Sequence, residues 1–275
     1  TVGGGESAPK AFKKDFSLKG QLYESLRDLA RWLGERDPLV RLTARKCKMA
    51  LVTTRETYEQ VLSLRATCIR VLGACALGEQ EIDSLKEMFR QNSTPIRFIS
   101  MGRLLHWKGF HLGLRAFDQS GVRNYEYWVI GDGPERGRLK GIAYSLNIES
   151  RVKFWGNLSR NEALAKLGQS SILIHPSLHD SGGFVCLEAM AAGKPVICLD
   201  LGGPAVQVTE ETGFKIQAHN PQQVVDDIAE AMKKLAASKS LRKQMGYAGQ
   251  KRVKDVFSWH VKANEFNRIY EKIAK

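Results

Sequence analysis

The chain has 275 residues, of which 43% are hydrophobic and 26% charged, and its formal net charge is +13. This length and composition allow one large domain or two smaller ones, each with a buried core. No apolar run approaches the roughly 20 residues that a membrane-spanning helix needs. The five cysteines form no C-x-x-C pair, which argues against a zinc or redox site and favours a reducing, cytoplasmic location.

The excess of positive charge is compatible with several kinds of partner. Nucleic-acid binding would require Lys and Arg clustered with aromatic side chains, and no such cluster occurs, so we expect no nucleic-acid partner. An anionic small substrate would use only a few of the charges. A basic surface that contacts the inner face of a membrane is a further interpretation, beside an ordinary solvated surface. The residues that could form it are Lys10, Lys13, Lys14 and Lys19.

Residues 1–90 predict too few elements for a complete doubly wound domain. Two short strands are predicted at residues 49–53 and 69–72, with a helix between them from about Glu56. One amphipathic helix is indicated by the helical spacing of Leu22, Leu26, Leu29 and Leu33.

From Pro95 onward, short apolar runs alternate with amphipathic stretches, which predicts a repeating β–α order. This order predicts an α/β fold with a doubly wound, Rossmann-like parallel sheet, whose ligands bind at the carboxyl ends of the strands. Ser159 and Glu162 form a capping box, and Asn220-Pro221 opens a periodic helix. The predicted strands cover residues 96–100, 127–130, 152–155, 172–175 and 195–199. The final residues, 259–275, predict a separate amphipathic helix.

Gly102, Arg103 and Lys108 follow the first of these strands in a Gly-Arg-x4-Lys-Gly pattern. Glycine lets a ligand approach the backbone closely, and two cations in one strand–helix loop suit a phosphate. Taken alone, the motif is explained more simply by two ordinary surface cations.

Three further glycine-containing motifs follow predicted strands. The Gly-Asp-Gly-Pro sequence at residues 131–134 is a good turn and indicates little about function by itself. Phe154 and Gly156 end a short strand, where an aromatic side chain beside an open backbone edge suits a flat base; a core strand is the alternative. Residues 200–204 include a Gly-Gly-Pro turn, a second backbone site for phosphate or sugar at the same edge.

The most informative stretch contains Asp180 and Glu188, two carboxylates eight residues apart. Gly182 and Gly183 lie between them, and a helix that begins near Phe184 would offer free amides to an anion. Glu188 lies within an apolar stretch and therefore needs a partner if it is buried. The hydroxyls of a ribose or a salt bridge to a core cation would each supply one.

In chain order these motifs read G-R-x4-K-G, G-D-G-P, V-x-F-x-G, E-x7-E with Asp180 at its first position, and G-G-P. Together they resemble the retaining glycosyltransferases of family 4, which have the GT-B fold. The resemblance covers about residues 95–257 and is highly specific, because five motifs occur in order. It implies a nucleotide-sugar donor, a carbohydrate or lipid-linked acceptor, and neither a metal nor a cofactor. The absence of a D-x-D motif agrees with a metal-free site.

The resemblance also implies a role for each matching residue. Arg103 and Lys108 would bind the donor diphosphate and stabilise the leaving group, and Asp180 would contact the transferred sugar. Glu188 would bind the ribose hydroxyls, and Phe154 with its neighbours would flank the nucleobase. The donor site would be completed by Gly102, Gly156, Gly182, Gly183, Phe184 and Val185.

The chain departs from the family pattern in three places. Asp180 is one methylene shorter than the usual Glu, and Gly182 stands where an aromatic is common, which we interpret as a subgroup form. The acceptor-side domain of the family is incomplete, so we expect a fragment or a truncated reading frame. We therefore predict a remnant of that domain at residues 1–90 and a donor-binding domain at residues 91–257. A helix at residues 258–275 is expected to pack back toward the N-terminal part.

These observations predict glycosyl transfer from a UDP- or GDP-sugar with retention at the anomeric carbon. A non-catalytic nucleotide-sugar-binding module is the main alternative, since most of the acceptor domain is missing. A GT-B relative such as a nucleotide-sugar epimerase or a phosphorylase is another, although nothing marks the pyridoxal phosphate lysine of a phosphorylase. Turnover of a nucleotide sugar, against saturable binding without turnover, would separate the first two.

Overall fold

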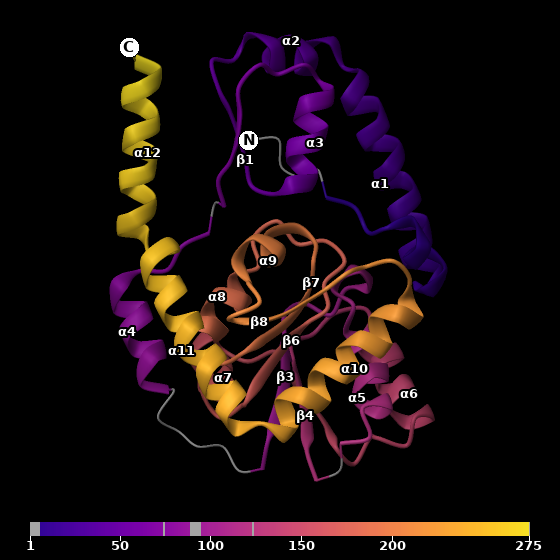
Figure 1. The fold of residues 1–275 in the computed structure, drawn as a ribbon. Helices are drawn as coiled ribbons and strands as arrows, with labels where there is room; N and C mark the ends of the chain where they lie inside the picture. Colours follow the sequence, from indigo (N-terminus) through magenta and orange to yellow (C-terminus); the bar gives the residue numbers. More distant parts are fainter. Residues whose placement is uncertain (1–5, 74, 89–94, 123, 275) are drawn as a thin grey trace.

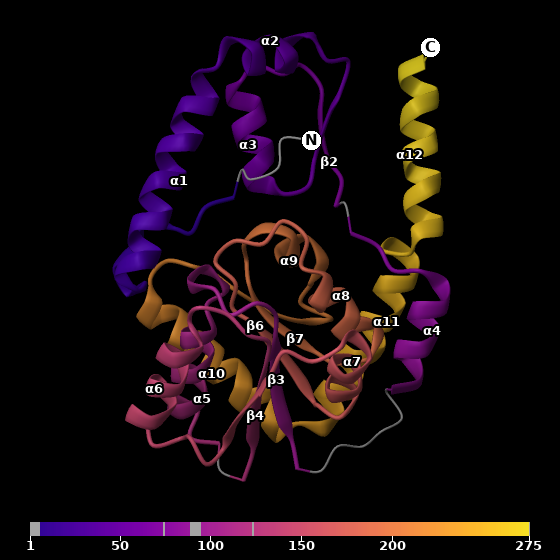
Figure 2. The ribbon, with the colours of Figure 1, turned by 180° about the vertical axis from the view of Figure 1, so that it is seen from behind.

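The computed structural model describes residues 6–73, 75–88, 95–122 and 124–274 of the chain. A six-stranded sheet has the strand order β5-β4-β3-β6-β7-β8, and every neighbouring pair is parallel. This arrangement confirms the predicted α/β fold with a doubly wound parallel sheet (Figures 1 and 2). The strands are β3 (Arg97–Met101), β4 (Glu126–Ile130), β5 (Val152–Gly156), β6 (Ile172–His175), β7 (Val196–Leu199) and β8 (Gly213–Ile216).

The five strands predicted beyond Pro95 correspond to β3–β7 within about one residue at each end. Strand β8 is an addition that the sequence pattern does not predict. It has four residues, of which Phe214 and Ile216 are large and apolar, and this pattern is too short to be recognised as a strand.

Helices cover both faces of the sheet and create two hydrophobic cores (Figure 1). Phe98 and Ile99 are adjacent in β3 and fully buried, yet they belong to different cores because side chains alternate along a strand. The first core is covered by α5 (Phe110–Gln119), α6 (Arg136–Ser145) and α10 (Pro221–Ala237). The second is covered by α4 (Glu79–Glu87), α7 (Arg160–Gly168), α8 (Phe184–Ala191) and part of α11 (Lys239–Val256).

A smaller N-terminal part lies beyond the carboxyl ends of the strands (Figure 1). Its two strands, β1 and β2, pair in parallel with Ala50 opposite Ile69. Helix α12 (Trp259–Ala274) runs alongside, and Glu265 on it forms a 2.9 Å ion pair with Arg70 of β2. The N-terminal elements are η1 (Lys10–Asp15), α1 (Leu18–Arg36), α2 (Pro38–Lys46), β1 (Ala50–Val52), α3 (Arg55–Ser63) and β2 (Ile69–Val71).

Helix α1 turns a polar face toward the rest of the molecule and leaves its apolar face exposed. Glu24 is fully buried, and its Oε1 accepts a hydrogen bond from Nε2 of His106 at 3.0 Å. Arg27, one turn later, contacts Nε2 of His179. Buried polar pairs therefore orient this helix. Its exposed face, which we call the leucine stripe, consists of Leu22, Leu26, Leu29 and Leu33, each more than half exposed.

Two loops at the carboxyl edge of the sheet pack closely because Gly109 has no side chain. Gly109 has a φ angle of 68°, and a Cβ added there would lie 1.9 Å from the carbonyl oxygen of Pro176. In the same contact, the amide of Leu178 donates to the carbonyl oxygen of Trp107 at 2.8 Å. The loop between β3 and α5 is thereby fixed against the loop between β6 and α8.

We expect Gly109→Ala to lower the free energy of unfolding by about 2–4 kcal/mol, because left-handed backbone strain adds to a steric overlap with Pro176. The control Gly141→Ala lies within α6, where a Cβ would meet nothing within 4 Å. It is expected to raise stability by about 0.5–1 kcal/mol, since glycine is unfavourable inside a helix. Urea unfolding measures both changes, and equal stability of the two variants would contradict the tight packing at Gly109.

Candidate functional site

The contact between these two loops brings Lys108 to Asp180. Lys108 is the last residue of the short 3-10 helix η3 (His106–Lys108), and Gly109 follows it. Its Nζ atom lies 2.5 Å from Oδ2 of Asp180, and both side chains are largely buried. The structure thereby joins two predicted site residues that are 72 positions apart in the chain.

The carboxylate of Asp180 accepts four hydrogen bonds. Oδ2 receives one from Lys108 and one from Nε2 of His175 at 3.1 Å. Oδ1 receives the amides of Gly182 and Gly183 at 3.2 and 3.0 Å. Burial would raise the pKa of Asp180, but the His175 hydrogen bond and the Lys108 charge outweigh burial and hold this pKa well below its usual range. Asp180 is therefore ionised at neutral pH.

The sequence predicts a Gly-Gly-Pro turn after β7, but the structure places Gly202 and Gly203 at the start of helix α9 (Gly202–Gln207). These two glycines fix the backbone of Asp180. The amide of Gly203 donates to the carbonyl oxygen of Asp180 at 2.8 Å, and a Cβ on Gly202 would lie 2.4 Å from that oxygen. The amide of Gly202 in turn donates to Oε1 of Glu56 in α3 at 3.0 Å. A residue of the N-terminal part thus contacts the turn that the sequence predicts as a backbone site for phosphate or sugar.

Helix α8 begins directly after this loop. Its N-cap is Gly183, which has a φ angle of 63°, and no described side chain caps this end of the helix. The first amides of a helix have no acceptor within the helix, so those of Phe184 and Val185 are suited to an anion. The Phe184 side chain is 49% exposed, whereas Val185 packs against the second core.

Glu188 on α8 is buried and pairs with a surface arginine rather than a core cation. Nη2 of Arg160, at the start of α7, lies 2.8 Å from Oε1 of Glu188, and the same guanidinium contacts Glu81 of α4. Burial raises the pKa of Glu188 above its usual value, although Arg160 opposes this effect. The Arg160 side chain is 60% exposed, so it lies between Glu188 and solvent.

The other predicted donor residues lie on neighbouring loops of the same edge. Gly102 and Arg103 follow β3 and are exposed, and within the described parts of the chain the Arg103 side chain forms no hydrogen bond or ion pair. Phe154 is partly buried and packs against the first core, and Gly156 ends β5 with a φ angle of 72°. Trp155, between them, is 36% exposed and presents an aromatic ring on the opposite face of the strand.

The sequence motifs do not mark His175 or Arg160 as site residues. A histidine at the buried end of a strand, five residues before a predicted site acid, is the available signal for His175. Burial lowers its pKa, so the ring is neutral and donates to Asp180 from Nε2. Arg160 gives no signal, since its partner Glu188 lies on a different helix.

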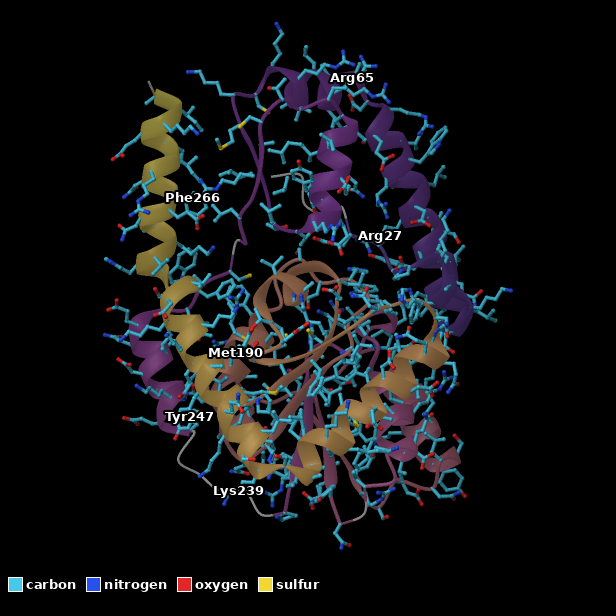
Figure 3. All side chains as sticks on the ribbon, viewed as in Figure 1. Arg27, Arg65, Met190, Lys239, Tyr247 and Phe266 are labelled. Carbon is cyan, nitrogen blue, oxygen red and sulfur yellow. The ribbon has the colours of Figure 1, made fainter. Side chains whose placement is uncertain are left out.

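An aromatic stack on the N-terminal side of Lys108 was also not predicted. The Trp107 ring lies between His179, with ring centres 4.9 Å apart, and Tyr23 of α1, at 5.4 Å. Arg27 donates to Nε2 of His179, at the junction of α1 with the loops of the sheet (Figure 3). The pKa of His179 is lowered to about 4, mainly because the ring is buried and also because the charge of Arg27 lies beside it. Through this stack, α1 packs against the loops that carry Lys108 and Asp180.

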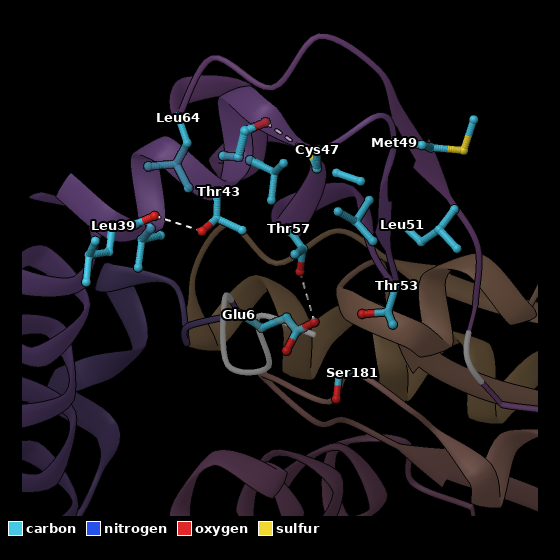
Figure 4. Close-up of a pocket in the computed structure, with 15 residues that line it drawn as sticks. Glu6, Leu39, Thr43, Cys47, Met49, Leu51, Thr53, Thr57, Leu64 and Ser181 are labelled. Atoms are coloured by element: carbon cyan, nitrogen blue, oxygen red, sulfur yellow. Dashed lines mark hydrogen bonds between the residues drawn. The ribbon is translucent and has the colours of Figure 1, made fainter. Parts of the chain in front are cut away.

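A cavity of about 630 Å³ lies in the N-terminal part, beside the predicted donor site (Figure 4). Its wall is mainly apolar and includes residues of α2, β1 and α3. Glu6 and Ser181 are among its polar lining residues, and Glu6 accepts a hydrogen bond from Thr54 at 3.1 Å. Ser181 follows Asp180, so the cavity adjoins the loop before α8.

None of the helices in the described residues combines the length and apolar character required to cross a bilayer. In the same residues, no group of three or more His, Cys, Asp and Glu side chains is placed to hold a metal ion. The metal-free site that the sequence indicates stays a prediction.

Curated proteins similar to this chain are named as glycosyltransferases. LpsD of Rhizobium meliloti (strain 1021), a lipopolysaccharide core biosynthesis glycosyltransferase, is 31% identical over 162 residues, which cover 58% of this chain and 45% of LpsD. The 2-deoxystreptamine glucosyltransferase of Streptomyces kanamyceticus is 28% identical over 198 residues, covering 70% of this chain and 50% of that protein. The chain therefore spans about half the length of these curated relatives.

Solved structures share the fold at lower sequence identity. Sucrose-phosphate synthase from Thermosynechococcus elongatus has a TM-score of 0.71 and 20% identity, covering 98% of this chain and 67% of that chain. HepE of Anabaena, solved in complex with UDP, has a TM-score of 0.67 and 20% identity, covering 85% and 66%. The expected GT-B fold is thereby confirmed. The family described as Glycosyl transferases group 1 matches residues 81–252, more than half of the chain. The chain belongs to the glycosyl transferases group 1 family.

Proposed function

We propose that this chain forms the nucleotide-sugar-binding half of a retaining glycosyltransferase. The observation that carries the proposal is the contact of Lys108 with Asp180 beside the uncapped start of α8. Both loops lie at the carboxyl ends of β3 and β6, between which the strand order reverses, and ligands of open α/β sheets bind at such a point. A cation and free helix amides there suit a nucleoside diphosphate. HepE, a structural neighbour, was solved with UDP.

In the proposed reaction, the bond between the anomeric carbon and the leaving diphosphate oxygen breaks. An acceptor hydroxyl oxygen bonds to that carbon on the same face, and its proton passes to the leaving phosphate. Arg103, Lys108 and the first amides of α8 stabilise the negative charge that develops on the diphosphate. The carboxylate of Glu188 accepts hydrogen bonds from the ribose hydroxyls, and no step requires a protein nucleophile.

We propose a carbohydrate or a lipid-linked glycan as the acceptor. LpsD is named for the biosynthesis of a lipopolysaccharide core. Other relatives are named for 2-deoxystreptamine and D-inositol 3-phosphate. Hydroxyl-rich acceptors are therefore the class to test first.

Arg103→Ala and Lys108→Ala are each expected to reduce turnover by about 10²-fold, because each removes a charge that stabilises the leaving diphosphate. Release of UDP or GDP from a panel of nucleotide sugars measures turnover in the intact protein. The control Lys140→Ala removes an exposed cation from α6 and is expected to keep the wild-type rate. Near-normal rates in both site variants would overturn the assignment. Saturable binding without turnover in the wild type would support the non-catalytic binding module instead.

Arg160→Gln is expected to make nucleotide binding more sensitive to acid. Burial raises the pKa of Glu188 and Arg160 lowers it, so the variant has a higher Glu188 pKa than the wild type. As the pH falls, Glu188 is protonated earlier in the variant and accepts fewer hydrogen bonds from the ribose.

Calorimetric titration with UDP and GDP, from about pH 8 down to about pH 5, measures this difference. The variant is expected to lose affinity at a higher pH than the wild type. Arg115→Gln, which removes a surface charge paired with Asp15, is the matched control. Identical pH profiles for Arg160→Gln and the wild type would contradict the role of Glu188.

We also propose that η1 and the start of α1 contact an anionic lipid surface on the cytoplasmic side of a membrane. Lys10 and Lys14 of η1 and Lys19 of α1 are exposed, whereas Lys13 pairs with Asp28. The leucine stripe is exposed on α1, which follows η1 directly. Basic residues beside exposed apolar side chains are typical of helices that lie on membranes.

Replacing Lys10, Lys14 and Lys19 by Glu is expected to weaken binding to phosphatidylglycerol-containing vesicles by about tenfold or more, since each lysine near such a surface contributes about 1 kcal/mol. Co-sedimentation measures the binding. Replacing Lys239, Lys243 and Lys251 of α11 by Glu gives the same net charge and serves as the control. Equal losses in both triple variants would show that net charge, rather than this surface, determines binding.

A further inference from the structure

The cavity in the N-terminal part has two chemically different ends. Glu6, Thr57 and Ser181 lie at the end toward the donor-site loops, whereas Leu39 and Leu64 lie farther from them (Figure 4). Most of the remaining wall is aliphatic and belongs to α2, β1 and α3. Its volume of about 630 Å³ is typical of small-molecule sites, which combine an apolar wall with a few polar groups. A ligand with one polar and one apolar end therefore suits this cavity.

Glu6 provides a hydrogen-bond acceptor at the polar end. The residue is only 4% exposed. Its Oε1 accepts the hydroxyls of Thr54 and Thr57 at 3.1 and 3.5 Å, and no side chain among the described residues donates to its Oε2. Burial and the nearby charge of Glu56 raise the pKa of Glu6, although the Thr54 hydrogen bond opposes them. A hydroxyl of a ligand would stabilise the ionised carboxylate, because a buried acceptor requires a donor.

The polar end of the cavity is built on the loops that carry the proposed donor site. Ser181 lines the cavity and directly follows Asp180. Glu56, which precedes Thr57 on the first turn of α3, accepts the amide of Gly202 at 3.0 Å. A hydroxyl held at this end therefore lies beside the loops that would present the sugar of the donor.

The apolar end of the cavity is close in sequence to the leucine stripe. Helix α2 begins after Asp37, the single residue that separates it from α1. Leu39 on α2 lines the cavity and is 70% exposed. Exposed leucines thus occur both on the helix proposed to contact lipid and at the cavity wall. An apolar chain anchored in lipid is therefore the kind of group that this end would receive.

We propose that the cavity binds the acceptor, and that this acceptor is an amphiphile whose alkyl or prenyl chain packs against α2, β1 and α3 while its hydroxyl end contacts Glu6. This inference rests on the proposed function, because it requires a sugar donor on the other side of Ser181. A free sugar has hydroxyls over its whole surface, and an aliphatic wall would leave many of them without hydrogen bonds. The cavity therefore favours a lipid-linked acceptor over a free carbohydrate.

Calorimetric titration with octyl and methyl β-D-glucopyranoside tests the apolar part of the site. The two probes share the same hydroxyl end and differ only in the length of the alkyl chain. We expect octyl glucoside, below the concentration at which it forms micelles, to bind the wild type about 10²-fold more tightly or more, because each buried CH₂ group adds affinity. Equal affinities for the two probes would overturn the inference.

Ala44→Phe fills the cavity from α2, since Ala44 lies in its wall. We expect this variant to lose most of the preference for octyl glucoside and to bind UDP or GDP as the wild type does. Ala263→Phe adds the same ring at an exposed position of α12 and is expected to keep the preference. Thr43→Phe, at an exposed position of α2 that also lines the cavity, replaces Ala44→Phe if thermal unfolding shows that variant to be unstable.

Two results with a folded filling variant would contradict the inference. An unchanged preference for octyl glucoside would show that the alkyl chain binds elsewhere. Weaker binding of UDP or GDP would show that the cavity belongs to the donor site. The double variant Leu26→Gln with Leu33→Gln tests the leucine stripe directly and is expected to keep the preference. Loss of the preference in this variant would place the alkyl chain on α1 and overturn the inference.

Glu6→Gln tests the polar end of the cavity. The amide oxygen of Gln still accepts from Thr54 and Thr57, but the negative charge is lost. We expect both glucosides to bind about tenfold more weakly, and by the same factor, because they share the hydroxyl end. Glu59→Gln, at an exposed position of α3, is the matched control and is expected to leave both affinities unchanged. Wild-type affinities in Glu6→Gln would contradict the proposed contact.

Nucleotide binding separates failure of this inference from failure of the proposed function. A wild type that binds UDP or GDP but does not distinguish the two glucosides has a donor site, and only the acceptor assignment fails. A wild type that binds neither nucleotide contradicts the proposed function, and the acceptor role of the cavity fails with it.

Discussion

The close approach of two loops at Gly109 is the constraint on which the rest of the site depends. A side chain at this position would overlap the carbonyl oxygen of Pro176, so the contact requires glycine. The same contact places Lys108 within 2.5 Å of Asp180. Because the Asp180 carboxylate also receives the Gly182 and Gly183 amides, the position of Lys108 and the start of α8 are set together. The close backbone packing at Gly109 thereby determines where the charges of Lys108 and Asp180 lie.

The pKa values of Asp180 and Glu188, the two carboxylates of the E-x7-E pattern, are shifted in opposite directions because the two groups have different partners. Both are largely buried, which favours the neutral form of each. Asp180 has four hydrogen-bond donors, including one cation, and these more than compensate for burial. In the described part of the chain, Glu188 forms an ion pair with one cation, Arg160, which is exposed to solvent and compensates only in part. The pKa of Asp180 therefore lies below its usual value, whereas the pKa of Glu188 lies above it.

Much of the fold follows from local signals in the sequence. Strands β3–β7 and the helix starts at Ser159 and Asn220 were predicted because apolar periodicity and capping residues act over a few positions. The edge strand β8 has too few apolar residues to be recognised. The spacing of Leu22 to Leu33 predicts helix α1, but it does not reveal that the leucines are exposed, because that depends on the buried pair of Glu24 and His106.

The sequence by itself determined that the chain is an α/β protein and that Lys108, Asp180 and Glu188 belong to its motifs. Both conclusions follow from features of the linear sequence, namely the alternation of strands and helices and the spacing of the motif residues. Only the tertiary structure decided which of these side chains touch each other. Lys108 and Asp180 meet across 72 positions, and Glu188 meets Arg160 from a different helix. Such pairs depend on how neighbouring loops pack at one edge of the sheet, and that packing depends on the complete three-dimensional arrangement rather than on any local stretch of residues.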